Sequence, residues 1–276
     1  MTALLALSFD NLGEAAEIEL GAIEPDAPEV GSHRTATETV PRILELLDAR
    51  GVSATFFVEG LNAELYPELL RRIDAEGHEV ALHAWRHEEW SRLSAAEQAE
   101  NLARGVAALE RLGLGVAGMR PPGGGLGEGG PRVLREAGLR YGSPAGSGAG
   151  VEDGLALLPF RWRHVDASCL LPPLFAVREE ISGSPEPIEP GDFVRHLERE
   201  VETLGERGGC AVLVLHPVTL DWLGEQRLEA ILALVAEASR GAAIEVAPLR
   251  ELADRVLAEP DRFGGAELDT ASWATG

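Results

Sequence analysis

The chain has 276 residues, 45% of them apolar, so it can bury the core of one large α/β barrel or of two smaller domains. A net charge of −22 argues against nucleic acid and anionic membrane surfaces as partners, and no apolar run approaches the roughly 18 residues of a membrane span. The N-terminus has no basic start and only a short apolar stretch, which predicts a cytoplasmic protein, although a secreted form with its leader removed would look the same.

Short apolar runs alternate with amphipathic helical patterns almost to the end of the chain. The runs, which we expect to form strands, span residues 3–9, 52–58, 79–84, 116–119, 155–160, 210–216 and 243–248. The helical patterns span residues 37–51, 64–77, 94–113, 193–208 with Asp192 as its cap, 223–241 and 248–259. This alternation predicts a parallel sheet covered by helices, closed or open. We expect a single α/β domain over residues 1–259 and a polar tail over residues 260–276.

Two stretches interrupt the alternation. Residues 123–130 are mostly glycine and residues 171–191 are rich in proline, so both are predicted to be long loops of the kind that form lids or binding walls. Cys169 and Cys210 have no metal-binding spacing and are expected to be buried thiols.

Polar and titratable side chains end several of the predicted strands. They are Asp10 and Asn11 after the first run, His83 and His87 at the third, Arg120 after the fourth, Asp166 after residues 155–160 and His216 at the end of residues 210–216. Each has an ordinary structural explanation, such as a turn, a helix cap or a core histidine. In parallel α/β barrels, however, the carboxyl ends of the strands meet at one face. The joint occurrence of these groups therefore indicates a reaction site.

The order of these motifs resembles the polysaccharide deacetylase family, carbohydrate esterase family four. The motifs are SFDN at 8–11, HAWRH at 83–87, RPP at 120–122 and LVLHP at 213–217, where the family has an Asp-Asp pair, His-x3-His, Arg-Pro-Pro and a late Leu-x-x-His. The resemblance covers nearly the whole chain. It implies a distorted (β/α) barrel, here with about seven parallel strands, and metal-assisted hydrolysis of N-acetyl groups on amino sugars.

Matching position by position, the resemblance implies a role for each motif residue. It implies four catalytic side chains: Asp10 as general base, Arg120 holding that base, His216 as general acid and Asp166 orienting the acid. It implies a divalent metal, zinc, on three ligands: Asn11, His83 and His87. These residue types suit amide hydrolysis, which needs an activated water, stabilisation of the developing oxyanion and a proton for the departing amine.

Asn11 departs from the family pattern, because a neutral carboxamide stands where the family has a carboxylate. We expect weaker metal binding, with three alternatives open. The ion binds Asn11 more weakly, or Asp10 or Glu14 becomes the third ligand, or the chemistry proceeds without metal on a small cyclic or linear amide. A degenerate barrel that binds saccharide without catalysis is a further alternative. The expected partner is a saccharide or small-molecule substrate, and the oligomeric state is left open.

The tryptophans around the histidine motif have two interpretations. Trp85 and Trp90 flank HAWRH and could stack on a sugar, but packing in the core or at the rim is at least as good an explanation.

Overall fold

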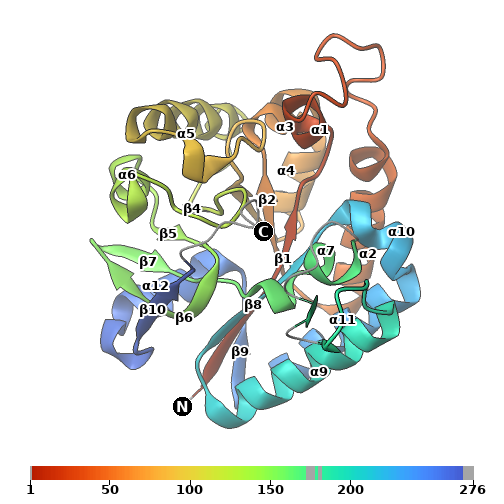
Figure 1. Cartoon of the computed structure of the whole chain (residues 1–276), viewed down its shortest axis with the longest axis vertical. Coiled ribbons are helices and arrows are strands. Elements are labelled where there is room, and N and C mark those ends of the chain that lie inside the picture. The colour runs from red at the N-terminus through yellow and green to blue at the C-terminus, as the bar shows by residue number, and fades with distance from the viewer. Residues whose placement is uncertain (1, 172–177, 180–181, 270–276) are drawn as a thin grey trace.

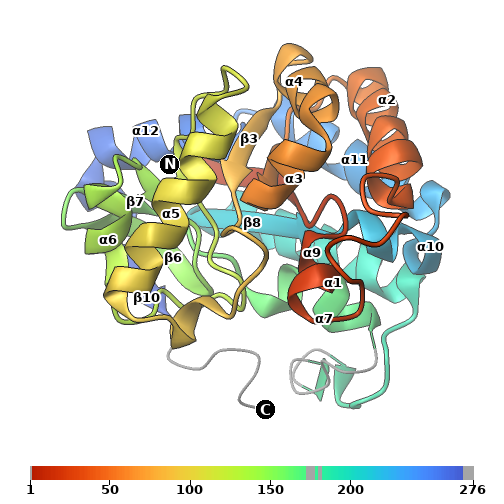
Figure 2. The same ribbon diagram turned by 90° about the horizontal axis from the view of Figure 1, so that it is seen from above.

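A curled, mainly parallel sheet forms the centre of the molecule, and helices cover its outer side (Figures 1 and 2). The computed structural model describes residues 2–171, 178–179 and 182–269. The strands run in the order β10-β6-β7-β5-β4-β3-β2-β1-β8, with β9 also paired to β1. Their bounds are β1 (Ala3–Asp10), β2 (Thr55–Val58), β3 (Glu79–Leu82), β4 (Gly118–Met119), β5 (Tyr141–Gly142), β6 (Gly146–Glu152), β7 (Leu155–Leu157), β8 (Cys210–Leu215), β9 (Ile244–Val246) and β10 (Gly265–Leu268).

The predicted α/β fold class is confirmed, with a small difference in strand number. Each of the seven apolar runs contains a parallel strand. The sequence missed β5, a parallel strand of two residues, and it missed β6 and β10, which are antiparallel and rich in glycine or polar residues. These three carry too little apolar periodicity to predict a strand.

The described helices comprise the six predicted ones, which lie close to their predicted positions, and short ones at residues 15–19, 130–136, 166–170 and 220–223 that were not predicted. They are α1 (Ala15–Glu19), α2 (Val40–Arg50), α3 (Gly60–Leu65), α4 (Pro67–Ala75), α5 (Ala95–Glu110), α6 (Gly130–Glu136), α7 (Asp166–Leu170), α9 (Pro190–Arg207), α10 (Leu220–Leu223), α11 (Glu225–Arg240) and α12 (Leu249–Ala258). Short 3-10 turns, among them η3 (Trp162–His164) and η4 (Pro217–Thr219), connect them, and a π-helical turn, η1 (Thr35–Thr39), precedes α2. The helix predicted over 64–77 is divided at Pro67, whose ring disfavours helical backbone at Tyr66.

The two irregular stretches and the tail are described in part. Residues 123–130 form a loop that leads into α6. Much of the predicted loop at 171–191 lies outside the described residues, namely 172–177 and 180–181. In the stretch 260–276, β10 pairs with β6, and residues 270–276 are outside the described part, so the division at 259 stays a prediction. None of the helices in the described ranges has the length and apolarity to span a membrane.

Strand β1 is buried on both faces, which explains its unbroken apolar sequence. Leu5, Leu7 and Phe9 face the core beneath the outer helices. Leu4 and Ala6 face the second core, inside the curve of the sheet, which α12 closes at one end. Because side chains alternate along a strand, Ser8 and Asp10 lie on the same face as Leu4 and Ala6. The alternation therefore directs the Asp10 carboxylate into the interior of the barrel.

The pairing of β4 with β5 depends on the lack of a side chain at Gly118. A Cβ at this position would overlap the ring of Tyr141, which is fully buried and whose hydroxyl donates to Glu79 Oε1 at 2.9 Å. We expect Gly118→Ala to lower the free energy of unfolding by about 1–3 kcal/mol through overpacking. Gly115→Ala is the matched control, because a Cβ there would have nothing within 4 Å. Urea unfolding of both variants measures the difference, and equal stability would contradict this account.

Candidate active site

A buried ion pair between Asp10 and Arg120 lies at the carboxyl end of β1. Arg120 follows β4, and its Nη1 donates to Asp10 Oδ1 at 2.6 Å and to Ser8 Oγ at 2.8 Å. Its Nη2 donates to Ser143 Oγ at 3.0 Å. Arg120 is 1% exposed and Asp10 4%. Burial raises the pKa of Asp10, and Arg120 and then His216 oppose that rise. The carboxylate is thus held in one orientation with Oδ2 left for another partner.

Aromatic rings enclose the guanidinium of Arg120. Its Cζ lies 4.1 Å from the ring centroid of Phe57 and 5.0 Å from that of Phe160. Both distances suit a cation–π contact, which offsets part of the hydration that the buried cation has lost.

The chain turns sharply at Asn11, with φ at 63°. Asparagine and aspartate tolerate this left-handed conformation better than most residues. The Asn11 Oδ1 atom is buried and has no hydrogen-bond partner among the described residues. Since a buried polar atom without a partner costs about 1–3 kcal/mol, this oxygen fits a site that is completed by a bound group.

The two histidines of HAWRH face the same cavity. The backbone between them is unusual, with φ at 62° for Ala84 and 77° for His87, and the two rings have centroids 5.0 Å apart. His83 Nδ1 donates to the carbonyl of Arg120 at 2.8 Å, so its Nε2 carries the free lone pair. Burial lowers the pKa of His83 well below its usual range, and burial with the nearby His216 lowers that of His87 to about 4. Both imidazoles are therefore neutral at neutral pH.

Two neutral imidazoles and an unpartnered carboxamide oxygen form a donor set that fits a divalent metal, though one without negative charge. Within the described ranges, no three His, Cys, Asp or Glu side chains lie close enough together to hold a metal by themselves, so the third ligand here would be Asn11. Glu14 does not complete the set, because the Tyr66 hydroxyl donates to its Oε2 at 2.5 Å and the Gly31 N–H donates to its Oε1. Of the alternatives for the third ligand, this geometry disfavours Glu14.

His216 forms the third part of the site, opposite the other two histidines. A parallel bridge between Val165 and Val214 sets Asp166 beside His216. Asp166 Oδ1 accepts from His216 Nδ1 at 2.6 Å, and its Oδ2 accepts from the His216 N–H at 2.8 Å and from the Thr219 hydroxyl. Burial by itself lowers the pKa of His216, but Asp166 and then Asp10 outweigh it and the net pKa is raised. His216 is thus poised to carry a proton on Nε2.

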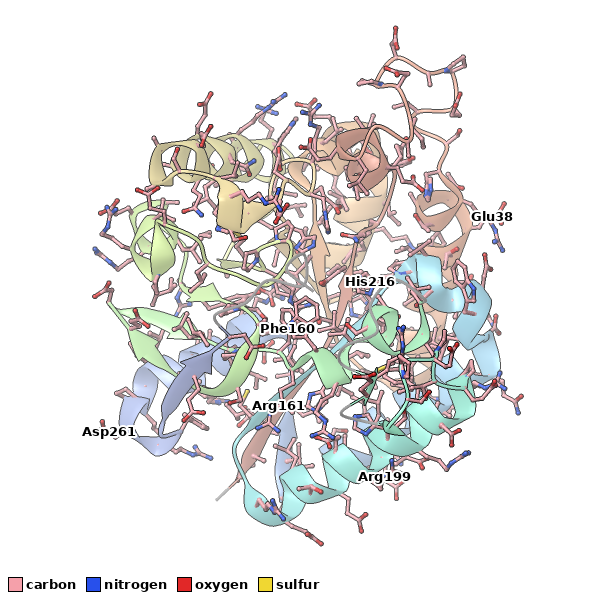
Figure 3. All side chains as sticks on the ribbon, in the orientation of Figure 1. Glu38, Phe160, Arg161, Arg199, His216 and Asp261 are labelled. Carbon is pink, nitrogen blue, oxygen red and sulfur yellow. The ribbon has the colours of Figure 1, made fainter. Side chains whose placement is uncertain are left out.

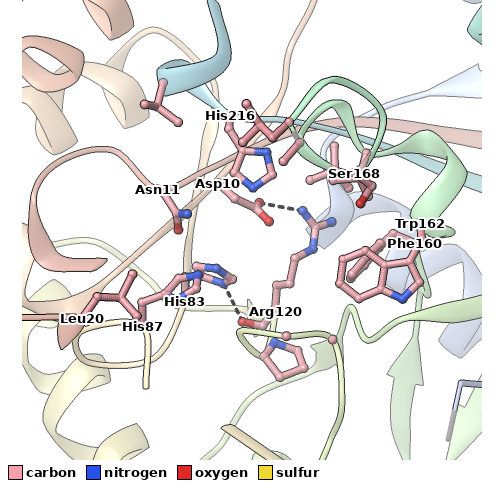
Figure 4. A pocket seen from close by; sticks show the side chains of 18 residues that line it. Asp10, Asn11, Leu20, His83, His87, Arg120, Phe160, Trp162, Ser168 and His216 are labelled. Carbon is pink, nitrogen blue, oxygen red and sulfur yellow. Dashed lines mark hydrogen bonds and ion pairs between the residues drawn. The ribbon is translucent and has the colours of Figure 1, made fainter. Parts of the chain in front are cut away.

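A cavity of about 330 Å³ brings these groups together (Figure 4). Its lining includes six of the seven predicted residues: Asp10, Asn11, His83, His87, Arg120 and His216. Asp166 lies behind His216 and is fully buried. Figure 3 shows His216 and Phe160 near the middle of the molecule, whereas Glu38, Arg199 and Asp261 lie at its edge.

The sequence analysis missed the aromatic side of this cavity. Phe160 and Trp162 line it, whereas Trp85 and Trp90 are 3% and 0% exposed and pack in the core. Trp85 packs against the guanidinium of Arg104, and Trp90 donates to the Leu126 carbonyl. Closeness in sequence to the histidines was therefore a poor guide. Position after the strand at 155–157 would have been a better one.

Glu59 is a further residue that the sequence analysis missed, although it directly follows β2. It is fully buried, its Oε2 accepts from Asn62 Nδ2 at 2.8 Å, and its Oε1 has no partner among the described residues. Burial raises the pKa of Glu59 to about 8, and the charge of Asp10 adds to the rise. Hydrogen bonds, including one from the Leu12 backbone, partly oppose it. Glu59 therefore supports the corner that carries Asp10 and Asn11.

The raised pKa of Glu59 predicts a pH-dependent stability. Between about pH 4.5 and 8 the folded protein holds a proton that the unfolded chain has lost, so the free energy of unfolding falls as pH rises. Glu59→Gln removes this titration. Relative to the variant, we expect the wild type to lose up to about 1.4 kcal/mol per pH unit in this window. Urea unfolding at pH 5, 6.5 and 8 measures it, with Glu64→Gln as surface control. Parallel stability profiles would refute the prediction.

Comparison with known proteins relates this arrangement to one family. The family model described as polysaccharide deacetylase matches residues 25–142, which include His83, His87 and Arg120. A peptidoglycan-N-acetylglucosamine deacetylase of Bacillus cereus is 35% identical over 86 residues, which is 31% of this chain and 31% of that protein. The match thus spans less than a third of this curated relative.

Solved structures match over nearly the whole chain. A candidate polysaccharide deacetylase from Mycobacterium smegmatis superimposes with a TM-score of 0.78 and 26% identity, covering 98% of this chain and 95% of that one. Puue allantoinase superimposes with a TM-score of 0.72 at 17% identity, over 93% of this chain and 90% of its own. The second likeness bears on the fold alone.

Proposed function

This chain belongs to the polysaccharide deacetylase family, and from that premise we propose that it hydrolyses the amide bond of an N-acetylated amino sugar with the help of a divalent metal. One observation carries the proposal: the pairs Asp10–Arg120 and His216–Asp166 face the same cavity from different strands. One pair offers a fixed base and the other a fixed acid. Amide hydrolysis requires both.

Asp10 acts as the general base. Arg120 binds its Oδ1, so Oδ2 is the atom that takes a proton from the attacking water. The burial that raises the pKa of Asp10 also makes it a stronger base than a solvated aspartate.

His216 acts as the general acid. Asp166 binds Nδ1, so the proton that reaches the departing amine comes from Nε2. The raised pKa of His216 keeps this proton in place closer to neutral pH, as a general acid requires.

His83, His87 and Asn11 would hold the metal through two ring nitrogens and Asn11 Oδ1. A divalent ion there supplies Lewis-acid polarisation of the amide carbonyl. The Arg120 carbonyl fixes the ring of His83 for this role.

A second candidate function is metal-independent hydrolysis of a small cyclic or linear amide. The neutral side chain at Asn11 favours it, because a carboxamide stands at the position where the family has a metal-binding carboxylate. Asp10, Arg120 and His216 would keep the same roles in this reaction.

The role of Asp10 predicts the effect of a conservative change. We expect Asp10→Asn to reduce kcat on an N-acetylated amino sugar by about 10²–10⁴-fold, because the variant cannot accept a proton. Asp254→Asn, an exposed aspartate on α12, should retain wild-type activity. Deacetylation is measured by acetate release, and circular dichroism verifies that both variants fold. A barrel that only binds saccharide would show no activity for Asp10→Asn to remove.

The neutral ligand at position 11 predicts a gain in metal affinity when charge is restored. Aspartate tolerates the left-handed backbone of Asn11, so Asn11→Asp should bind zinc at least about tenfold more tightly, equivalent to ~1.4 kcal/mol. Calorimetric titration measures this, with Asn101→Asp adding the same charge on α5 as a control. A wild-type protein that takes up no metal and keeps full activity with a chelator would overturn the metal part and support the metal-independent alternative.

A further inference from the structure

The cavity has two sides of different chemistry. The polar side carries the six residues described above. The other side is formed by Phe160 and Trp162, and Val165, Leu171, Val214 and Val218 add further apolar side chains to the lining. Figure 4 shows Phe160, Trp162 and Ser168 across Arg120 from His83 and His87. A molecule whose amide lies at the polar side must therefore place one of its substituents against the apolar side.

The aromatic part of this apolar side is held in place by packing. Phe160 and Trp162 meet edge to face, with ring centroids 5.0 Å apart and planes at 85°. Gly124 lies against Trp162 so closely that an added Cβ would be 3.1 Å from its ring and 2.6 Å from Ala145 Cβ. Gly124 also accepts a hydrogen bond from the Ala145 N–H at 2.8 Å. The glycine-rich loop thus supports a preformed wall rather than a lid.

The apolar side offers few hydrogen-bond partners to a polyhydroxylated ring. Among the described lining residues outside the catalytic set, the hydroxyl of Ser168 and the indole N–H of Trp162 are the polar side-chain groups. The Ser168 Oγ has no hydrogen-bond partner in the described part of the chain. Each sugar hydroxyl enclosed here without a partner would lose its hydrogen bonds to water. An apolar substituent would instead gain from leaving water.

We propose that this side of the cavity is a subsite for an apolar substituent of the substrate amide, about the size of a six-carbon ring. The inference rests on the proposed amide hydrolysis, whose base and acid it keeps. It moves the substrate from an N-acetylated amino sugar to an amide with an apolar group, because that sugar has only a methyl group on the acyl carbon and a hydroxylated ring on the nitrogen. The apolar group is attached either to the acyl carbon or to the nitrogen, and any sugar hydroxyls lie outside the apolar wall. The cavity of about 330 Å³ falls at the small end of the range for small-molecule sites.

Binding of small amides tests the subsite without turnover. N-methylacetamide is the base compound, N-methylcyclohexanecarboxamide places the ring on the acyl side, N-cyclohexylacetamide places it on the nitrogen, and N-acetylglucosamine replaces that ring with a hydroxylated one. Since each buried methylene tightens binding about fourfold, we expect at least one cyclohexyl compound to bind more than about tenfold better than N-methylacetamide. It should also bind better than N-acetylglucosamine. Calorimetry or ligand-observed NMR gives the affinities.

Two tryptophan variants locate the effect. Trp162→Ala should lose most of the gain from the cyclohexyl ring and leave N-methylacetamide unaffected. Trp222→Ala is the matched control, because Trp222 is 54% exposed and does not line the cavity. Equal affinity for all four amides, preference for N-acetylglucosamine, or equal effects of the two variants would overturn the proposal. A protein that ranks the amides as expected but hydrolyses none would support this subsite and refute the proposed hydrolysis instead.

Discussion

The buried pair of Asp10 and Arg120 is the interaction on which the rest of the site depends. Through its guanidinium Arg120 binds Ser8 and Asp10 of β1 and Ser143 after β5, and through its carbonyl it fixes the ring of His83 after β3. Arg120 therefore sets the positions of both the Asp10 carboxylate and the His83 imidazole. Because both charges are buried, loss of either partner leaves the other uncompensated, a change that typically costs about 3–5 kcal/mol. The interior of the barrel can therefore bury Arg120 only together with Asp10 and the two serine hydroxyls that bind it.

Three histidines in one cavity have pKa values shifted in opposite directions because their partners differ. His83 and His87 have low pKa values since burial removes their hydration and a positive neighbour adds to the effect. His216 is equally enclosed, yet Asp166 accepts both its Nδ1–H and its backbone N–H and raises its pKa. The same residue type would thus serve as a lone-pair donor on one side of Asp10 and as a proton donor on the other in the proposed reaction. Environment alone separates these roles.

The parts of the fold that the sequence predicted are those with strong local signals. The buried strands have long apolar runs, and the helix predicted over 94–113 begins with a capping box of Ser94 and Glu97. The rule that parallel strands share a carboxyl edge also predicted that the seven site residues lie close together. Trp162 on the short turn η3 also follows a strand, β7, but it matched no motif and was missed. Strand-end position could also have identified Glu59, since it directly follows β2, but its single carboxylate matched no motif.

The side chain at position 11 and the apolar wall of the cavity both affect how strongly a metal would bind. Asp10 and Arg120 balance each other, as do Asp166 and a protonated His216, so the described catalytic groups have little spare negative charge. A dication on His83, His87 and Asn11 would bring its full charge into a cavity whose far side is formed by Phe160 and Trp162, where screening is poor. An aspartate at 11 would compensate part of that charge directly, whereas asparagine leaves it to water and substrate. An apolar wall and a neutral ligand would therefore both weaken the binding of a metal. Of the cavity residues, Asn11 bears most directly on whether hydrolysis is metal-assisted or metal-independent.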